Sequence, residues 1–230
     1  MDDYYAIYYG LTGLALLISL SAQAYIRFAY SKYAKVPVSS GITGMQAARQ
    51  LLDSQDLYQV GINQVAGTLS DHYDPANKVV NLSSGNYTDA SIAAVAVACH
   101  ECGHALQDKE GYAFMRIRAA LIPAVNFSSY AGYLAIMVGV FFGLTNIIWL
   151  GILLEMVILL FQVITLPVEV DASSRALKQM QLSGYFSDEE LKDSKTVLTA
   201  AALTYVAGVA TTLLEIMRLI LLYGRRNNRD

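Results

Sequence analysis

The sequence predicts an α+β integral membrane protein that is mainly helical, with about four membrane helices and a small polar domain containing a short β-sheet. Of its 230 residues, 55% are apolar and only 15% are charged, against about 25% charged residues in a typical soluble domain. The apolar residues are gathered in long uncharged runs, which are typical of membrane-spanning helices. The net charge of -3 excludes the basic surface that nucleic-acid binding requires.

The first membrane helix is expected over residues 4–30, of which residues 4–26 carry no charge. A helix needs about 20 apolar residues to cross a bilayer core. A cleaved signal peptide is not favoured, because acidic residues precede this run and basic residues follow it. The basic flank, which includes Arg27 and Lys32, is expected to be cytoplasmic by the positive-inside rule.

Residues 119–166 are expected to form a membrane hairpin of two helices, 123–143 and 146–166, each about 31 Å long at 1.5 Å per residue. Basic residues on both flanks place both neighbouring polar segments in the cytoplasm. Residues 196–222 are expected to form a fourth membrane helix. A partly inserted or interfacial helix is the alternative, because a fourth crossing would put three arginines on the outer side, namely Arg225, Arg226 and Arg229.

The two polar segments, residues 37–117 and 167–195, are expected to form one domain that the membrane hairpin interrupts. The capping-box spacing of Thr43 and Gln46 predicts a helix from residue 44. This helix is expected to end at residue 52. Strands are expected at 60–65, 67–72 and 78–82, with a turn at 74–77. A second helix is expected at 90–107, with Thr88 or Asp89 as its N-cap. The strand at 78–82 is expected at a sheet edge, where an extended peptide could add to it.

The helix expected over residues 90–107 carries a His-Glu-x-x-His motif at residues 100–104. Residues four apart share one face of a helix, so His100 and His104 can bind one metal ion. Glu101 is then placed to take a proton from a metal-bound water. We expect one zinc ion per chain, because imidazole suits zinc and zinc lowers the pKa of bound water to about 7. The competing interpretation is that both histidines are polar surface residues.

A third metal ligand is expected either at His72 or in the acidic segment that follows the hairpin, where Glu169 and Asp171 lie. An ordinary carboxylate near a helix start is the alternative interpretation of Glu169. His72 is expected beside the cleft, where it would polarise a substrate carbonyl or bind the metal.

The segment around Glu169 resembles the Glu-x-x-Ala-Asp third-ligand helix of HtpX-like and CAAX prenyl membrane proteases. Glu169 matches the ligand and Ala172 matches the alanine, whereas Ser173 stands where those proteins carry aspartate and Asp171 lies two residues earlier. HtpX-like proteins also thread a membrane hairpin between their two metal-binding helices.

A closer resemblance covers nearly the whole chain. The Asp-His-Tyr-Asp-Pro run at residues 71–75, the run at 91–98 before His100, and the Leu-Pro pair before Glu169 are similar to the YugP-type membrane zinc metallopeptidases. This resemblance implies a zincin-like, gluzincin domain in which His100, His104 and Glu169 bind zinc. It also implies that Glu101 acts first as general base and then as proton donor to the leaving amine. Asp171 and His72 are the further candidates around the site.

The function expected from these residues is that of a membrane-anchored zinc endopeptidase (a hydrolase). It would be a multi-pass protein of the cell membrane with its active site facing the cytoplasm. Its partners would be the lipid bilayer and protein or peptide substrates. It would hydrolyse peptide bonds of membrane or misfolded proteins. The alternative is a catalytically silent membrane interaction subunit that retains a metal fold. An intramembrane-cleaving protease is disfavoured, because too few apolar residues precede His100 for the motif helix to span a bilayer.

Two further pairs of residues have structural interpretations. Cys99 and Cys102 are expected to be buried thiols, because on a helix they point away from the two histidines of the motif. Arg218 is expected to pair with Glu155, an acid inside the hairpin, or with Glu215 three residues before it.

Overall fold

The computed structural model describes residues 2–224 and, for residues 2–5, the backbone alone. Within this range the chain forms seven helices and three strands. The helices are α1 (Asp2–Tyr33), α2 (Gly44–Ser54), α3 (Ser84–Thr88), α4 (Ile92–Glu110), α5 (Ala113–Phe142), α6 (Thr145–Ser183) and α7 (Asp188–Tyr223), and the strands are β1 (Gly61–Val65), β2 (His72–Asp74) and β3 (Val79–Ser83). The three arginines that bear on the orientation of the last helix, Arg225, Arg226 and Arg229, lie outside the described residues.

Four helices are long and apolar enough to cross a membrane: they cover Ala6–Tyr33, Ala113–Phe142, Thr145–Ser183 and Asp188–Tyr223. The strands form one small sheet of three. Together these features confirm the predicted fold class, a mainly helical α+β membrane protein.

The chain divides into two compact units. We call the first the membrane unit, which comprises the residues up to Gln23, Arg116–Leu166 and the residues from Thr204. We call the second the polar unit, which comprises Ala24–Met115 and Pro167–Leu203. All the residues of the His-Glu-x-x-His motif and the acidic segment after the hairpin belong to the polar unit.

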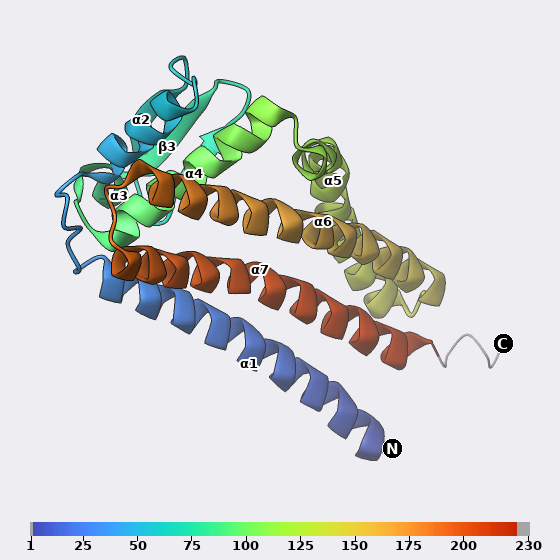
Figure 1. Ribbon diagram of the computed structural model, residues 1–230. Coiled ribbons are helices and arrows are strands. Elements are labelled where there is room, and N and C mark those ends of the chain that lie inside the picture. The colour runs from blue at the N-terminus through green and yellow to red at the C-terminus, as the bar shows by residue number, and fades with distance from the viewer. Residues whose placement is uncertain (1, 225–230) are drawn as a thin grey trace. The chain divides into compact units, whose positions relative to one another are not determined.

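Helix α4 forms the centre of the polar unit, where α2 lies against it (Figure 1). The predicted capping box at the start of α2 is present, since Thr43 Oγ1 accepts a hydrogen bond from Gln46 N and Gln46 Oε1 accepts one from Thr43 N. A Cβ at Gly44 would lie 2.0 Å from Asn86 O and 2.9 Å from Ala94 O. Glycine is therefore required at this position for α2 to approach α3 and α4 so closely.

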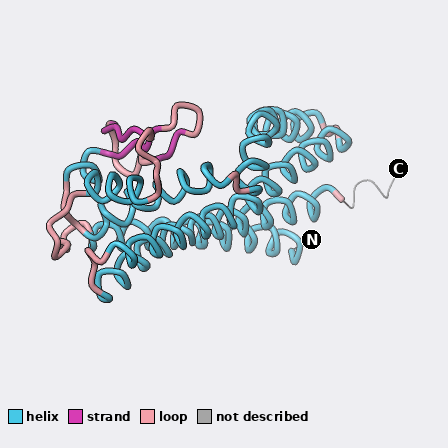
Figure 2. Tube along the Cα trace, turned by 45° about the horizontal axis from the view of Figure 1, so that its top comes forward, coloured by secondary structure: helices cyan, strands magenta, loops and turns pink. Residues whose placement is uncertain are grey.

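The strands are magenta in Figure 2. The sheet has the strand order β1-β3-β2, with β1 parallel and β2 antiparallel to β3. The turn between β2 and β3 forms where predicted, because Asp74 Oδ1 accepts the backbone N–H groups of Ala76 and Asn77. The prediction that residues 78–82 form an edge strand is wrong. β3 is the central strand, because β1 pairs with its other side and leaves no free edge to which a peptide could add.

Two expected boundaries in this region are also wrong. The strand expected over residues 67–72 is replaced by β2, which begins only at His72, because Gly67 and Leu69 adopt positive φ angles of 108° and 55° that interrupt extended backbone. The N-cap of α4 is Ser91, whose Oγ accepts a hydrogen bond from Ala94 N at 3.3 Å, and neither Thr88 nor Asp89. The short helix α3, absent from the prediction, ends at Thr88, three residues before this N-cap.

Helix α6 continues through Pro167 without a break, so one helix of 39 residues joins the second half of the membrane hairpin to the acidic segment. It ends at Ser183, followed by Gly184 with a φ of 70°. α7 then begins at Asp188, eight residues before the expected start of the fourth membrane helix. The expected third-ligand segment, 167–195, therefore consists of the end of α6, a short connection and the beginning of α7.

In the membrane unit, small residues bring α5 and α6 close together. A Cβ on Gly139 would lie 2.9 Å from the backbone N of Ile148, and one on Gly151 would lie 3.1 Å from Gly132 O. Such contacts between small residues are typical of helix pairs in membranes. Arg218 forms its ion pair with Glu215, the second of the two predicted partners, and also donates hydrogen bonds to Tyr8 and Thr12.

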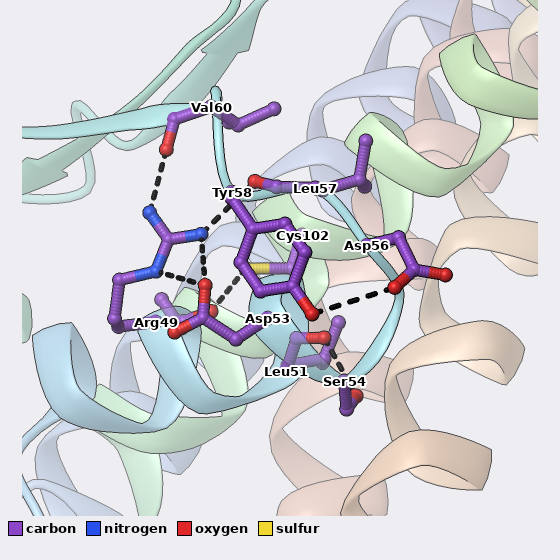
Figure 3. Close-up of polar contacts among 10 residues, drawn as sticks. Arg49, Leu51, Asp53, Ser54, Asp56, Leu57, Tyr58, Val60 and Cys102 are labelled. Atoms are coloured by element: carbon purple, nitrogen blue, oxygen red, sulfur yellow. Dashed lines mark hydrogen bonds and ion pairs between the residues drawn. The ribbon is translucent and has the colours of Figure 1, made fainter.

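Arg49 on α2 fixes the loop that leads from α2 to β1 (Figure 3). Its guanidinium donates hydrogen bonds to Asp53 Oδ1 at 2.8 Å, to Leu57 O at 2.9 Å and to Val60 O at 2.8 Å. Leu57 and Val60 are both buried. Leu57 O also accepts the backbone N–H of Val60 at 3.1 Å, so the carbonyl of Val60 is the one that depends most on the arginine.

Replacing Arg49 with Met is expected to lower the free energy of unfolding by about 2 kcal/mol, because the carbonyl of Val60 loses its side-chain donor and the carbonyl of Leu57 loses one of its two hydrogen bonds. Thermal unfolding of the detergent-solubilised protein, followed by circular dichroism, measures the effect as a Tm lower by about 5 °C. The control is Arg27→Met, since Arg27 is exposed and has no side-chain hydrogen bond within the described part of the chain. An equal Tm for both variants would contradict the proposed role of Arg49 in fixing the loop between α2 and β1.

Candidate active site

The motif on α4 and the acidic segment on α6 meet in the polar unit. Nε2 of His100 lies 3.3 Å from Oε2 of Glu169, and Nε2 of His104 lies 3.6 Å from the same oxygen. In the described range, these three side chains are the only group of His, Cys, Asp or Glu residues close enough together to hold a metal ion, with ligand atoms within 4.8 Å of one another. Ligand atoms about 2.1 Å from a tetrahedral zinc ion lie about 3.4 Å apart, which the two distances from the histidines to Glu169 match.

The charge and burial of the triad also fit a metal ion. The side chains of His100, His104 and Glu169 are 15%, 9% and 4% exposed, and a carboxylate so deeply buried requires a positive partner. Burial lowers the pKa of His104, but its contact with Glu169 and the negative charges of Glu101 and Glu169 together raise that pKa above its ordinary value. The site therefore attracts positive charge, which a metal cation would supply in place of a proton.

Both imidazoles are oriented through their other ring nitrogen. Nδ1 of His100 lies 3.1 Å from Oγ of Ser173, and Nδ1 of His104 lies 3.0 Å from Oε1 of Gln107. A ring that donates its Nδ1–H to such a partner directs the lone pair of Nε2 toward the metal position. The sequence interpretation missed both partners, although Gln107 is one helical turn beyond His104 and Ser173 is one turn beyond Glu169.

Asp171 lies outside the triad and contacts it through Gln107. Gln107 Nε2 donates hydrogen bonds to Asp171 Oδ2 and to Val168 O, each at 2.8 Å. Arg175 in turn donates from Nε to Asp171 and from Nη1 to Glu110. The geometry thus places Asp171 where it can hold the amide that orients His104, and not where it could itself bind the metal.

His72 lies on β2, is exposed, and does not join the triad. Its Nδ1 lies 2.9 Å from Ser70 O and its Nε2 lies 3.1 Å from Asn81 Nδ2. Neighbours of His72 have structural contacts: Asp71 accepts hydrogen bonds from Ser83 and Asn86, and Tyr73 donates one to Asp108 at 2.7 Å. These contacts tie the sheet to α3 and α4.

The two cysteines of α4 are buried, as predicted, with Cys99 2% and Cys102 0% exposed. Burial raises the pKa of Cys99 to about 12 and that of Cys102 well above its ordinary value. Because the thiolate is the form that binds metals and attacks disulfides, these residues act as small apolar groups of the core.

Gly103 sets the distance between the two helices of the site. A Cβ at this position would lie 2.3 Å from the carbonyl oxygen of Ala172 on α6. This close crossing allows the carboxylate of Glu169 to reach both imidazoles on α4. No sequence observation had given Gly103 a role, although it lies inside the motif.

Replacing Gly103 with Ala is expected to push α4 and α6 apart, which would lower zinc affinity at least tenfold and cost about 2 kcal/mol of stability through overpacking. The matched control is Gly13→Ala, where a Cβ would meet no atom within 4 Å. Zinc content after dialysis and Tm measure the two effects. Unchanged zinc binding in the Gly103→Ala variant would contradict the role of this crossing.

Replacing Gln107 with Leu is expected to lower zinc affinity about 10-fold to 100-fold, as is typical for groups that orient a ligand. The reason is that His104 loses the partner of its Nδ1, while Asp171 loses a donor. Competition with a chromophoric zinc chelator measures the affinity. Gln50→Leu is the control, since Gln50 is exposed on α2, and equal affinities for the two variants would refute the prediction.

Comparisons with known proteins identify the family of the chain. Residues 8–224 match the protein family described as "Putative neutral zinc metallopeptidase". The chain is 44% identical over 220 residues to the "Putative membrane protease YugP" of Bacillus subtilis (strain 168), covering 96% of this chain and 97% of that protein. No solved structure matches the chain significantly. The resemblance to the YugP-type proteins is therefore confirmed, and the chain belongs to this neutral zinc metallopeptidase family.

Proposed function

We propose that this protein is a membrane-anchored zinc endopeptidase that hydrolyses peptide bonds of membrane or misfolded proteins, with its active site on the cytoplasmic side. The observation that carries the proposal is the convergence of His100, His104 and Glu169 around one buried position, with Glu101 beside them on α4. Membership of a zinc metallopeptidase family supports zinc as the metal of this triad.

His100, His104 and Glu169 would hold the zinc ion through two nitrogens and one oxygen. When bound, zinc acts as a Lewis acid that lowers the pKa of water and polarises a substrate carbonyl. Glu101 would accept the proton of the attacking water and pass it to the leaving amine. Its position supports this role, because Glu101 is adjacent to His100 in sequence and its charge acts on His104.

The contacts of Glu101 favour an enzyme over a catalytically silent subunit. The residue is only 7% exposed, yet within residues 2–224 its carboxylate makes no hydrogen bond or ion pair that would explain its burial. A buried carboxylate without a structural partner is destabilising. Its presence beside the metal site is explained by proton transfer, whereas a structural zinc site needs no base.

The positive-inside rule supports a cytoplasmic active site. Basic residues that include Arg27, Lys32 and Arg175 belong to the polar unit, which also holds the triad. An active site on that side would meet cytoplasmic segments of membrane proteins and unfolded cytoplasmic chains.

The test is cleavage of reduced, unfolded casein by the full-length protein purified in detergent, with zinc content measured on the same sample. We expect about one zinc ion per chain, loss of cleavage after removal of zinc with a chelator, and recovery on addition of zinc. Fully folded protein that contains no zinc would overturn the metal site. Zinc-loaded protein that cleaves neither casein nor a solubilised membrane protein would support the interaction subunit instead.

A further inference from the structure

A groove with a volume of about 750 Å³ runs between α6 and α7 within the polar unit. One face of each helix lines it, over residues 170–181 of α6 and 188–202 of α7. The lining positions recur three or four residues apart on both helices, as expected for two helical faces turned toward one space.

The groove begins beside the triad. Val170 follows Glu169 directly, and Ser173, which lines the groove, contacts Nδ1 of His100 at 3.1 Å. His100 is also the most exposed of the three candidate ligands, at 15% against 9% for His104 and 4% for Glu169. The groove therefore starts one hydrogen bond away from His100, at the Nδ1 side of its ring, while the three candidate ligands themselves do not line it.

The groove combines an apolar lining with unpaired positive charge. Leu177, Leu191 and Leu198 contribute the apolar surface. Three exposed lysines line the groove: Lys178, Lys192 and Lys195. None of the three forms an ion pair within the part of the chain that the structure describes, and Asp188 is the one acidic residue of the lining.

We propose that this groove binds the extended substrate segment next to the scissile bond, and that its three lysines select segments with acidic side chains. The inference rests on the proposed peptidase function and adds a substrate class to it. Electrostatic complementarity of this kind discriminates between partners more than it adds affinity. The apolar lining would contact the alternate side chains of the same segment.

The dimensions of the groove fit an extended peptide. The stretch from Val170 to Gln181 spans about 16 Å at 1.5 Å per residue of helix, a length that about five residues of extended chain cover at 3.3 Å each. Lys178 lies five residues beyond Ser173, about 8 Å along the helix. We therefore expect the acidic preference within about two or three residues of the scissile bond.

The first experiment uses the zinc-loaded, full-length protein and maps its cleavage sites in unfolded casein by mass spectrometry. Peptide pairs are then made around an observed site, with Glu in one peptide and Gln in the other at the positions within three residues of the cleaved bond. The expected result is a kcat/KM about fivefold to tenfold higher for the acidic peptide, carried mainly by a lower KM. The preference is expected to shrink in 0.5 M NaCl, because exposed charges are screened.

The variants are Lys178→Gln, Lys192→Gln and Lys195→Gln, alone and combined, and the combined variant is expected to lose the preference. The matched control is Lys35→Gln, which removes an exposed lysine outside the groove lining and should keep it. Zinc content and Tm are measured on every sample and identify a variant that fails to fold. If the combined variant fails to fold, the peptide preference of the single variants decides the outcome.

The outcomes separate this inference from the function on which it rests. Zinc-loaded wild-type protein that cleaves nothing would overturn the peptidase function and the groove together. Cleavage with equal rates for Glu and Gln peptides, or a preference that survives in the combined lysine variant, would overturn the groove inference alone. A third outcome also overturns it: activity that needs anionic lipid in vesicles and loses that need in the lysine variants, with peptide preference unchanged, would make the groove a lipid-headgroup site.

Discussion

Replacing Glu101 with Gln is expected to abolish peptide hydrolysis while zinc remains bound. The amide has nearly the size of the carboxylate but cannot accept a proton from the attacking water. General base catalysis contributes about 10²-fold to 10⁴-fold, so we expect kcat to fall by about 10³-fold. Because Glu101 is buried without a structural partner among the described residues, the neutral side chain should leave Tm unchanged or slightly higher.

The measurement is the initial rate of casein cleavage at equal zinc loading. Glu189→Gln is the matched control, because Glu189 is an exposed residue in the first turn of α7, and we expect wild-type rates from it. A Glu101→Gln variant that keeps more than about a tenth of the wild-type rate would show that another group takes the proton.

Replacing Glu169 with Gln is expected to lower zinc affinity by about 10³-fold or more, because the triad loses its charged ligand. Both imidazoles face Oε2 of this residue, at 3.3 and 3.6 Å. The comparison variant is Asp171→Asn, which changes the other carboxylate of the segment. Asp171 reaches His104 only through Gln107, so its loss should cost at most about 10-fold to 100-fold.

Zinc affinity of both variants is measured by competition with a chromophoric chelator, and zinc content is measured after dialysis. The order of the two effects decides which carboxylate is the ligand. A larger loss in Asp171→Asn than in Glu169→Gln would assign the ligand role to Asp171 and contradict the geometry of the triad.

Much of the fold follows from local patterns in the sequence. Long uncharged runs predicted the four apolar helices, because a segment of that length and composition is stable only where its backbone and side chains are both shielded from water. The capping box at Thr43 and the Asp74 turn were also predictable, because each is a set of hydrogen bonds between residues close in sequence. The helix of the motif was predictable from its run of small apolar residues.

Boundaries that depend on distant partners were predicted less well. The strand expected at a sheet edge is central, because its place depends on β1, which pairs with it across about 18 residues of sequence. Pro167 stands at the expected boundary between the third membrane helix and the third-ligand segment, yet α6 passes through it. Arg218 had two sequence-compatible partners, and the i, i+3 neighbour Glu215 is the one that it contacts.

For the candidate site, the sequence by itself determined the chemical groups: two imidazoles one helical turn apart, a carboxylate between them, and an acidic segment about 65 residues later. Helical spacing alone brings His100 and His104 together. The tertiary structure decided that Glu169 and not Asp171 meets them, because the crossing of α4 and α6 at Gly103 determines which face of α6 turns toward the histidines. It also decided that Ser173 of α6 is the partner of the His100 ring, since a hydrogen bond to a side chain on another helix has no signature in the spacing of either helix.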